Sequence, residues 1–458
     1  MAKRTKPVAK KAPQKRASKP AGKVAGVPVR AGAARVRTII IGTRGTPRER
    51  YEVRIGAGTI AHAVDGVLGT RHGALLVIDA GVPRALIEPL LRALDRAQVR
   101  WGVRIVEASE GGKSLLTLES ILVEAARLRL ERRDAIIGVG GGIVTDLAGF
   151  AAAVYRRGVR VVQCPTTLLA MVDAAVGGKT AANLVVPDAA GKPRVLKNLV
   201  GAFHQPARVQ IDTDALASLP ARELRAGLAE CIKHGLLGGG LQDAGLLDWT
   251  EKNAGRILSL DGGVLAELIA RNVALKARVV GRDEHENSTK PDGGRMMLNL
   301  GHTFAHAIET LDGLAWRDGT GRLVTGALKH GEAVGLGLLA AARVSVSLGL
   351  CEKTLAGRVG GLLSAVGLPT ALESMPSGVQ ILERMREDKK TEGGRVRLVL
   401  PVRGGRVRVR DDVPEREGLL GIGGWGVGVD RDESFCWGGV WGLVRAPAGP
   451  WCVATGGA

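Results

Sequence analysis

The sequence contains few aromatic residues and few cysteines. Phe, Trp and Tyr make up 3% of its 458 residues, and the five cysteines show neither paired spacing nor a CxxC motif. A disulfide framework needs an even set of regularly spaced cysteines, and a zinc ribbon needs CxxC pairs. We therefore expect a protein of a reducing compartment and predict a cytoplasmic location.

Long apolar runs are also missing, and so are acidic residues in the N-terminal arm. No window reaches the roughly 20 apolar residues of a membrane span, and no signal-peptide core follows the basic start. Residues 1–37 hold twelve Lys or Arg and no acid, more than half of the net charge of +20. We interpret this arm as a disordered basic tail. Weak contact of the tail with nucleic acid stays open, but a basic folded face typical of nucleic-acid binding is not indicated.

Between residues 38 and 212, short β-branched runs alternate with Ala- and Leu-rich segments of helical length. Each run closes on Gly, Pro or Thr, as in "GALLVIDAGVP" and "RDAIIGVGGG". This alternation predicts a Rossmann-like domain with a parallel α/β sheet. The ligand site of such a sheet lies beyond the carboxyl ends of its strands.

From residue 213 to 415 helical stretches dominate, which predicts a second, all-α domain with the active site in the cleft between the two. A short piece near its end, "RVRLVLPVRGGRVRVRDDV", predicts a strand or hairpin. Residues 416–458 are Gly-rich, hold four of the seven tryptophans and lack periodicity. We interpret them as an atypical tail, for which a shifted reading frame is one plausible origin.

The stretch "IIGVGGGIVTDLAGF" places three glycines between an apolar run and an Ala-rich helix. Glycines allow the backbone to approach a ligand closely, and a helix start offers N–H groups to a phosphate. The pattern suits the pyrophosphate of a dinucleotide. An ordinary turn explains it equally well, and it is not the GxGxxG fingerprint.

The next stretch, "CPTTLLAMVDAAVGGKTAANLVV", sets several polar residues in an otherwise apolar context. They are Thr166, Thr167, Asp173, Lys179 and Asn183. A lysine after a Gly-Gly turn can meet an anion, and a nearby carboxylate can orient a hydroxyl. The alternative is a surface loop with incidental charges, but the clustering favours a site.

Candidate metal ligands lie in apolar helical stretches of the second predicted domain. They are Glu230, His234, His302, His306 and His330. Two imidazoles and one carboxylate with an open position are typical of Lewis-acid zinc. A lone His is more often an ordinary core residue. The i,i+4 spacing of two pairs puts each pair on one helix face, so spacing alone leaves the ligand set open.

Further cations accompany these Gly and His motifs and indicate a polyanionic substrate that carries phosphate, carboxylate or both. They are Arg157, Lys233, Lys276, Arg295 and the pair Lys389 and Lys390.

Taken together, the motifs resemble those of 3-dehydroquinate synthases. They run in order from about residue 38 to 415 and include "EGGKSLLTLE", "GGGIVTDLAGFAAAVYRRGV", "LPARELRAGLAECIKHGLL", "LNLGHTFAHAIE", "HGEAVGLG" and "EDKK". The resemblance implies a homodimeric carbon–oxygen lyase that depends on NAD and zinc, with cobalt as an alternative metal. It also implies the reaction: 3-deoxy-arabino-heptulosonate 7-phosphate is converted into 3-dehydroquinate and phosphate, in the shikimate pathway of aromatic amino acid biosynthesis.

The resemblance also implies roles for individual residues. The metal ligands fall on Glu230, His302 and His330, so that His306 becomes a substrate contact near the phosphate. The implied NAD contacts are Glu110, Lys113, Gly142, Ile143, Val144, Thr145, Asp146, Thr166, Thr167, Lys179, Lys197, Ala215, Leu216, Ala217 and Ser218. The implied contacts of the substrate hydroxyls are Asp173, Lys179 and Lys233, and those of its carboxylate are Lys276 and Arg295. The implied phosphate contacts are Asn198, Asn299, His306, Arg157 and Lys390, with Lys390 preferred to Lys389. In this family the arginine at the position of Arg157 comes from the partner subunit.

The chain departs from the family pattern in three loops and at one helix position. "NLVVPDAAGKPRVLKN" is longer than the usual "NHPxGKN", extra residues appear in "HENSTKPDGG" and between Glu309 and His330, and Ala305 replaces a usual glycine. These insertions touch loops of the expected active site.

Three other functions compete with this interpretation. Another sugar phosphate cyclase, such as a 2-epi-5-epi-valiolone or inosose synthase, is disfavoured because Lys276, Arg295 and Asn299 are all present. A metal-dependent polyol dehydrogenase would accumulate NADH. A nucleic-acid-binding protein with an inactive core would depend on the basic tail.

Overall fold

The computed structural model describes residues 36–42, 50–187, 191–388 and 396–426. Lys389 and Lys390, one of them expected at the phosphate, lie outside the described residues, as does the predicted basic tail up to residue 35. Within the described part of the chain, no helix is long and apolar enough to cross a membrane.

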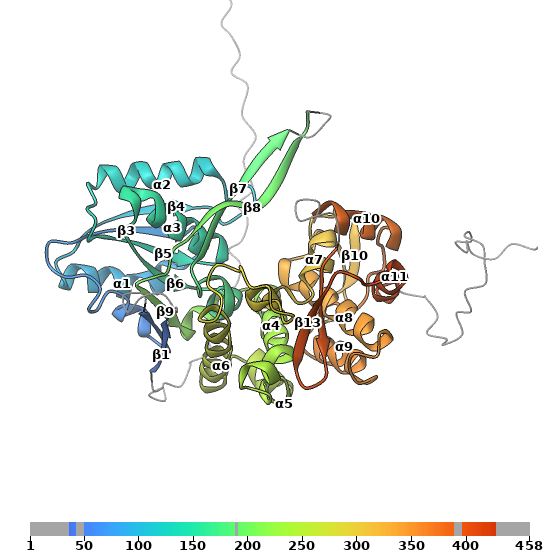
Figure 1. Cartoon of the computed structure of the whole chain (residues 1–458). Helices are drawn as coiled ribbons and strands as arrows, with labels where there is room; N and C mark the ends of the chain where they lie inside the picture. Colours follow the sequence, from blue (N-terminus) through green and yellow to red (C-terminus); the bar gives the residue numbers. More distant parts are fainter. Residues whose placement is uncertain (1–35, 43–49, 188–190, 389–395, 427–458) are drawn as a thin grey trace, which may run out of the picture. The chain divides into compact units, whose positions relative to one another are not determined.

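A seven-stranded sheet forms the first part of the structure, in the order β1-β2-β9-β6-β5-β3-β4 (Figure 1). All neighbours are parallel except β1, which pairs antiparallel with β2 at one edge. The strands are β1 (Arg37–Gly42), β2 (Arg50–Gly56), β3 (Gly73–Asp79), β4 (Arg100–Val106), β5 (Ala135–Gly140), β6 (Arg160–Pro165) and β9 (Arg208–Asp212). The predicted parallel α/β sheet is therefore confirmed.

Helices cover both faces of this sheet, because alternate residues of each central strand point to opposite sides. On β3, Leu76 and Ile78 belong to the core cluster that contains α1, whereas Leu75 and Val77 belong to the cluster that contains α2 and α3. The helices are α1 (Arg84–Arg96), α2 (Leu115–Arg127) and α3 (Gly142–Val154), with short helices η1 (Thr59–His62), η2 (Tyr155–Arg157), η3 (Ala170–Ala174) and η4 (Thr213–Ser218).

A separate antiparallel hairpin, β7 (Lys179–Pro187) and β8 (Pro193–Phe203), follows η3. It contains the sequence stretch that is longer than the family pattern. Val185 and Val195 near its tip are largely exposed. Lys179 lies at the base of the hairpin, opposite Phe203, whereas Lys197 and Asn198 lie midway along β8, beside the register shift between Ala182 and Leu184.

The second part of the structure is mainly helical, as expected. Its helices are α4 (Ala221–Leu237), α5 (Leu246–Leu258), α6 (Gly262–Val280), α7 (His302–Glu309), α8 (His330–Ser347), α9 (Leu355–Ala365), α10 (Gly378–Asp388) and α11 (Glu415–Gly423), with η5 (Gly238–Leu241) and η6 (Gly294–Asn299). The predicted terminal hairpin is observed as β12 (Leu398–Val402) and β13 (Arg406–Arg410). The extra residues between α7 and α8 form a second hairpin, β10 (Leu314–Arg317) and β11 (Leu323–Gly326), which the sequence did not predict.

Helix α11 and Trp425 lie beyond the predicted domain boundary at residue 415, yet they pack into the helical part. The Trp425 side chain is fully buried, and its Nε1–H donates to the Leu336 carbonyl of α8 at 3.0 Å. Its ring meets Phe304 of α7 edge-on, with centroids 6.3 Å apart. Trp425 therefore joins the two helices that begin with His302 and His330.

We predict that Trp425→Ala lowers the free energy of unfolding by about 3–5 kcal/mol, because a large aromatic side chain is lost from a packed core. Leu420→Ala is the matched control, since Leu420 on α11 is 47% exposed. We expect the control to change stability by less than about 0.5 kcal/mol. Urea denaturation of both variants measures the difference, and equal losses would show that Trp425 does not anchor this segment.

Candidate active site

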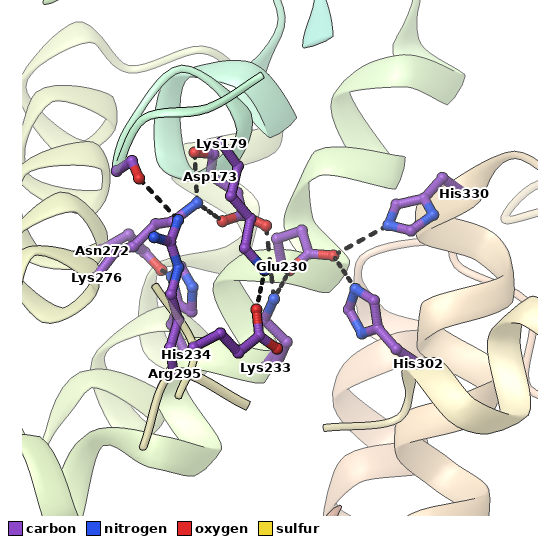
Figure 2. Close-up of polar contacts among 12 residues, drawn as sticks. Asp173, Lys179, Glu230, Lys233, His234, Asn272, Lys276, Arg295, His302 and His330 are labelled. Carbon is purple, nitrogen blue, oxygen red and sulfur yellow. Dashed lines mark hydrogen bonds and ion pairs between the residues drawn. The ribbon is translucent and has the colours of Figure 1, made fainter. Parts of the chain in front are cut away.

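The centre of the site is a buried carboxylate on α4 that faces two histidines from other helices. The Glu230 side chain is fully buried, and its Oε1 lies 3.6 Å from His302 Nε2 and 3.5 Å from His330 Nε2 (Figure 2). One ligand atom from each of the three residues falls within 4.8 Å of the others. This is the spacing that a divalent cation needs for one carboxylate and two imidazoles.

Backbone packing brings α7 close enough to α8 for this convergence. Gly301, which precedes His302, has a φ of 78°, and a Cβ added there would lie 2.8 Å from the Leu338 backbone nitrogen of α8. A side chain at Gly301 would therefore be strained and would collide with α8. The glycine before the first histidine fixes the close approach of the two helices.

The charges around Glu230 make the cluster suitable for a cation. Burial alone would raise the pKa of Glu230, but the adjacent Lys233 ammonium and the nearby His330 ring hold it well below its usual range. Lys233 forms an ion pair with Oε2, whereas Oε1 has only the longer contacts with the two histidines and no well-formed hydrogen bond from the described residues. A buried, ionised carboxylate with such an oxygen is a strong ligand for a metal ion.

The two histidines differ in their electrostatic surroundings. Burial lowers the pKa of His302 to about 3, and the nearby Lys233 ammonium adds to this effect, so the ring is neutral. Burial would lower the pKa of His330, but its contacts with the Glu230 and Glu309 carboxylates dominate and raise it to about 10. A cation that binds here displaces the proton from His330 and takes over the positive charge that the two carboxylates require.

A second charged centre lies next to the first and combines a carboxylate from the sheet part with lysines from two helices. Asp173, in η3, pairs with Lys276 of α6 and lies 3.6 Å from Lys233 Nζ of α4 (Figure 2). Burial would raise the pKa of Asp173, but the two ammonium groups hold it well below its usual range. Because Lys233 contacts both Asp173 and Glu230, the two centres form one network.

Lys276 differs from Lys233 in its proton affinity. Burial lowers the pKa of Lys276 to about 8, because Asp173 offsets the loss of hydration only in part and Arg295 opposes the charge. For Lys233, Asp173 and Glu230 outweigh the loss of hydration and raise the pKa. Near neutral pH, Lys276 is thus the lysine of this centre that exchanges a proton more readily.

Arg295 is a third buried cation near Asp173 and Lys276. Its guanidinium is buried and donates to the carbonyls of Gly177 at 2.8 Å and Glu284 at 2.5 Å, while Nε has no hydrogen-bond partner among the described residues. A buried guanidinium with one unsatisfied N–H can receive a carboxylate.

The carboxyl ends of β5 and β6 bring the glycine turn and the two threonines together. Thr166 N donates to Gly140 O at 2.9 Å, and a Cβ on Gly141 would lie 3.2 Å from Thr167 Cγ2. Helix α3 begins at Gly142, and no side chain caps its first turn. Its N–H groups therefore face the end of the sheet, as phosphate binding requires.

Other residues expected at NAD surround this turn. Lys113 Nζ donates to Asp146 Oδ2 at 2.6 Å and also to Asn198 Oδ1. Asn183 connects Glu110 with Asn198, because its Nδ2 donates to Glu110 Oε2 at 3.0 Å and its Oδ1 accepts from Asn198 N at 3.0 Å. The structure thus brings together residues of α3, of the segment before α2 and of the β7–β8 hairpin.

Several other expected site residues lie outside these clusters. In η4, Ala215 and Leu216 are buried in the core, whereas Ala217 and Ser218 are exposed. Arg157 is exposed and follows α3, a helix of 13 residues, so it lies about 20 Å from the glycine turn of its own chain. The His306 ring is exposed and packs edge-on against His302 with centroids 5.7 Å apart, outside the cluster of three.

Comparison with known proteins identifies the family. The sequence model described as 3-dehydroquinate synthase N-terminal matches residues 103–226, and the one described as 3-dehydroquinate synthase C-terminal matches residues 227–391. The chain belongs to the 3-dehydroquinate synthase family. The family resemblance of the sequence motifs is therefore confirmed, and the activity is that of this family, the conversion of 3-deoxy-arabino-heptulosonate 7-phosphate into 3-dehydroquinate and phosphate.

Individual relatives agree with this assignment. The chain is 42% identical over 372 residues to the 3-dehydroquinate synthase of Caulobacter vibrioides, and the alignment covers 80% of this chain and 92% of the relative. It is 40% identical over 371 residues to that of Symbiobacterium thermophilum, with 80% and 95% covered.

Solved structures share the fold of this 3-dehydroquinate synthase family member. The 2-epi-5-epi-valiolone synthase of Streptomyces hygroscopicus, with NAD+ and Zn2+ bound, matches with a TM-score of 0.68 at 26% identity and covers 81% of this chain and 95% of that one. A 2-deoxy-scyllo-inosose synthase complex matches with a TM-score of 0.66 at 22% identity, with 84% and 99% covered, which shows the fold alone. The predicted combination of a Rossmann-like sheet and a helical part is confirmed.

The sequence analysis did not identify two acidic residues of this 3-dehydroquinate synthase site, Glu286 and Glu309. Glu286 pairs with Lys179 and accepts from Asn299 Nδ2 at 3.2 Å, and Glu309 touches His330 and Lys197. Glu309 follows His302 by seven residues, two helical turns, so helix periodicity places it on the same face of α7. Glu286 lies in an inserted loop, for which no periodicity exists.

The buried His234 leads to a prediction about pH. Its Nδ1 lies 3.0 Å from Asn272 Oδ1, and burial lowers the pKa of His234 from 6.5 to about 4. Below pH 6.5, His234 binds a proton in the unfolded chain but stays neutral in the folded chain down to about pH 4. The free energy of unfolding therefore decreases as the pH falls through this range. His234→Gln keeps an amide near Asn272 but does not titrate.

We therefore expect the free energy of unfolding of the original protein to decrease by about 1 kcal/mol more than that of His234→Gln between about pH 7.5 and about pH 5.5. Urea denaturation at both pH values measures it. Equal decreases in the two proteins would show that His234 titrates normally.

Proposed function

We propose that this member of the 3-dehydroquinate synthase family uses NAD and zinc, with the metal held by Glu230, His302 and His330. The convergence of these three residues beside the centre of Asp173, Lys233 and Lys276 is the observation that carries the proposal. The valiolone synthase that shares the fold was solved with NAD+ and Zn2+, which supports both cofactors. Cobalt suits the same ligand set.

The zinc site fits the residues present. A carboxylate and two imidazoles leave one open position on a tetrahedral ion, and Glu230 Oε1 faces both histidines. When bound, zinc would polarise a substrate hydroxyl as a Lewis acid.

The NAD site fits the carboxyl ends of β5 and β6. The uncapped first turn of α3, Gly142 to Asp146, with Thr166 and Thr167 beside it, suits the pyrophosphate. Lys113, Glu110 and Lys197 would bind the remaining polar groups of the dinucleotide. When bound, NAD would supply an oxidising equivalent that is returned within the same turnover, so no net NADH would form.

The chain's own residues bind and orient the substrate and move its protons. Asp173 is ionised and accepts a hydrogen bond from a substrate hydroxyl, while Lys233 and Lys179 donate to neighbouring oxygens. Lys276, with its pKa of about 8, holds or releases a proton at Nζ close to neutral pH. Binding all groups in one network supplies orientation on the order of several kcal/mol.

The anionic ends of the substrate have separate contacts. Arg295 Nε and Lys276 receive the carboxylate, because Nε is an unsatisfied buried donor. Asn198, Asn299, His306 and Lys390 receive the phosphate, together with Arg157. Because Arg157 lies at the far end of α3 in its own chain, we propose that it acts in the partner subunit of a homodimer.

The remaining proposals concern the whole chain. We assign residues 38–212 to NAD binding and 213–415 to metal and substrate binding, with a basic tail before them and a Gly/Trp-rich tail after them. The enzyme works in the cytoplasm as part of a biosynthetic pathway.

We predict that the two histidines of "GHTFAH" separate in function. His302→Ala should lose zinc and activity together, because one of three ligands is removed. His306→Ala should keep about one zinc per subunit and raise the KM for substrate, since only a phosphate contact is lost. Metal analysis and steady-state kinetics measure this, and equal zinc loss in both variants would refute the assignment.

We also predict the substrate. Purified enzyme should release phosphate from 3-deoxy-arabino-heptulosonate 7-phosphate and not from sedoheptulose 7-phosphate, which lacks the carboxylate for Arg295 and Lys276. Absorbance at the NADH band should stay constant throughout. Turnover of sedoheptulose 7-phosphate alone would favour a valiolone-type cyclase, and accumulating NADH would favour a dehydrogenase.

A further inference from the structure

Glu309, at the end of α7, contacts two parts of the site that the proposed function assigns to different cofactors. Its Oε2 lies 3.3 Å from His330 Nδ1, and its Oε1 accepts from Lys197 Nζ at 2.9 Å. The Glu309 side chain is only 10% exposed, so both contacts are shielded from water. Electrostatic interactions of this carboxylate with both partners are therefore stronger than they would be in water.

The contact with His330 orients the ring toward the metal cluster. His330 turns Nε2 toward Glu230 Oε1, 3.5 Å away, while Nδ1 faces Glu309. A carboxylate that accepts from Nδ1–H leaves the lone pair of Nε2 for the metal. Glu309 therefore fixes both the tautomer and the rotation of this ligand.

The contact with Lys197 leads to the opposite side of the site. Lys197, on β8, also lies 3.5 Å from Glu110 Oε1. The next residue, Asn198, pairs with Lys113, which in turn donates to Asp146 on α3. The proposed function places Glu110, Lys113 and Asp146 at NAD. The path from the metal cluster to the NAD site thus passes from His330 through Glu309 to Lys197.

We propose that Glu309 is a positioning residue that couples metal binding to NAD binding, so that each cofactor increases the affinity for the other. This inference rests on the proposed function. When a metal holds Nε2 of His330, the ring is fixed in place, and its Nδ1 contact fixes the Glu309 carboxylate, whose other oxygen accepts from Lys197 Nζ. Lys197 is thereby held more firmly at its place on β8, beside the NAD contacts.

Thermodynamic linkage makes the effect reciprocal and measurable. In the full-length protein, isothermal titration calorimetry gives the dissociation constant of NAD with and without zinc, and that of zinc with and without NAD. We expect zinc to lower the NAD dissociation constant about tenfold, within the usual range of such couplings. The same factor must appear in the zinc titrations.

Glu309→Gln keeps the shape of the side chain and removes its charge. We expect zinc to bind about 10- to 100-fold more weakly to this variant, as for other partners of metal-bound histidines. At saturating zinc, its NAD dissociation constant should equal that of the zinc-free variant. Lys197→Met should bind NAD more weakly in both states and should also show no dependence on zinc.

Glu332→Gln is the matched control. Glu332 is a buried carboxylate on α8, two residues after His330, and accepts two hydrogen bonds of 2.7 Å from Arg222, but it does not contact Lys197. This variant should unfold at a lower temperature and retain the full coupling factor. A general loosening of α8 would instead reduce the coupling in the control as well, which would overturn the inference.

The outcomes separate the two claims. A protein that binds no zinc or no NAD overturns the proposed function, and with it this inference. A protein that binds both, but shows no mutual dependence or keeps it in Glu309→Gln, overturns the inference and leaves the proposed function standing.

Discussion

The structure of the site depends on one buried, ionised carboxylate, that of Glu230. A carboxylate without access to water is unstable unless positive or polar groups face it. Lys233 satisfies this need from the next turn of α4, and His302 and His330 do so from the starts of α7 and α8. Three helices must therefore meet at one point. The close contact at Gly301 and the buried Trp425 serve that convergence.

Lys233 extends the same constraint to the sheet part of the chain. It contacts Asp173, which lies in η3 shortly after β6, and Asp173 also pairs with Lys276 of α6. Alternating charges thus run from the histidine cluster to η3, the short helix that follows β6. The NAD- and zinc-dependent reaction that we propose needs its proton-handling groups and cofactors within such a short range.

The sequence predicted the elements with strong periodic patterns. Strands such as β5 are buried on both faces, so they appear as continuous apolar runs, and the parallel sheet followed from their alternation with helices. The β10–β11 hairpin was missed because its strands have four residues each, too few for a periodic signal. Helix α11 and Trp425 lie in a Gly-rich stretch where a single buried ring, not a repeating pattern, anchors the chain.

The order of motifs along the chain was sufficient to determine the family, the fold class and the chemistry to expect, because these depend on local residue types and spacing. Residue spacing could not decide which of the five candidate residues bind the metal, because Glu230 and His234 share one helix face just as His302 and His306 do. Only the tertiary structure decided that His302 and His330 face Glu230 while His234 turns to Asn272. It alone placed Glu309 between His330 and Lys197, because contacts between distant segments depend on how helices and strands pack together.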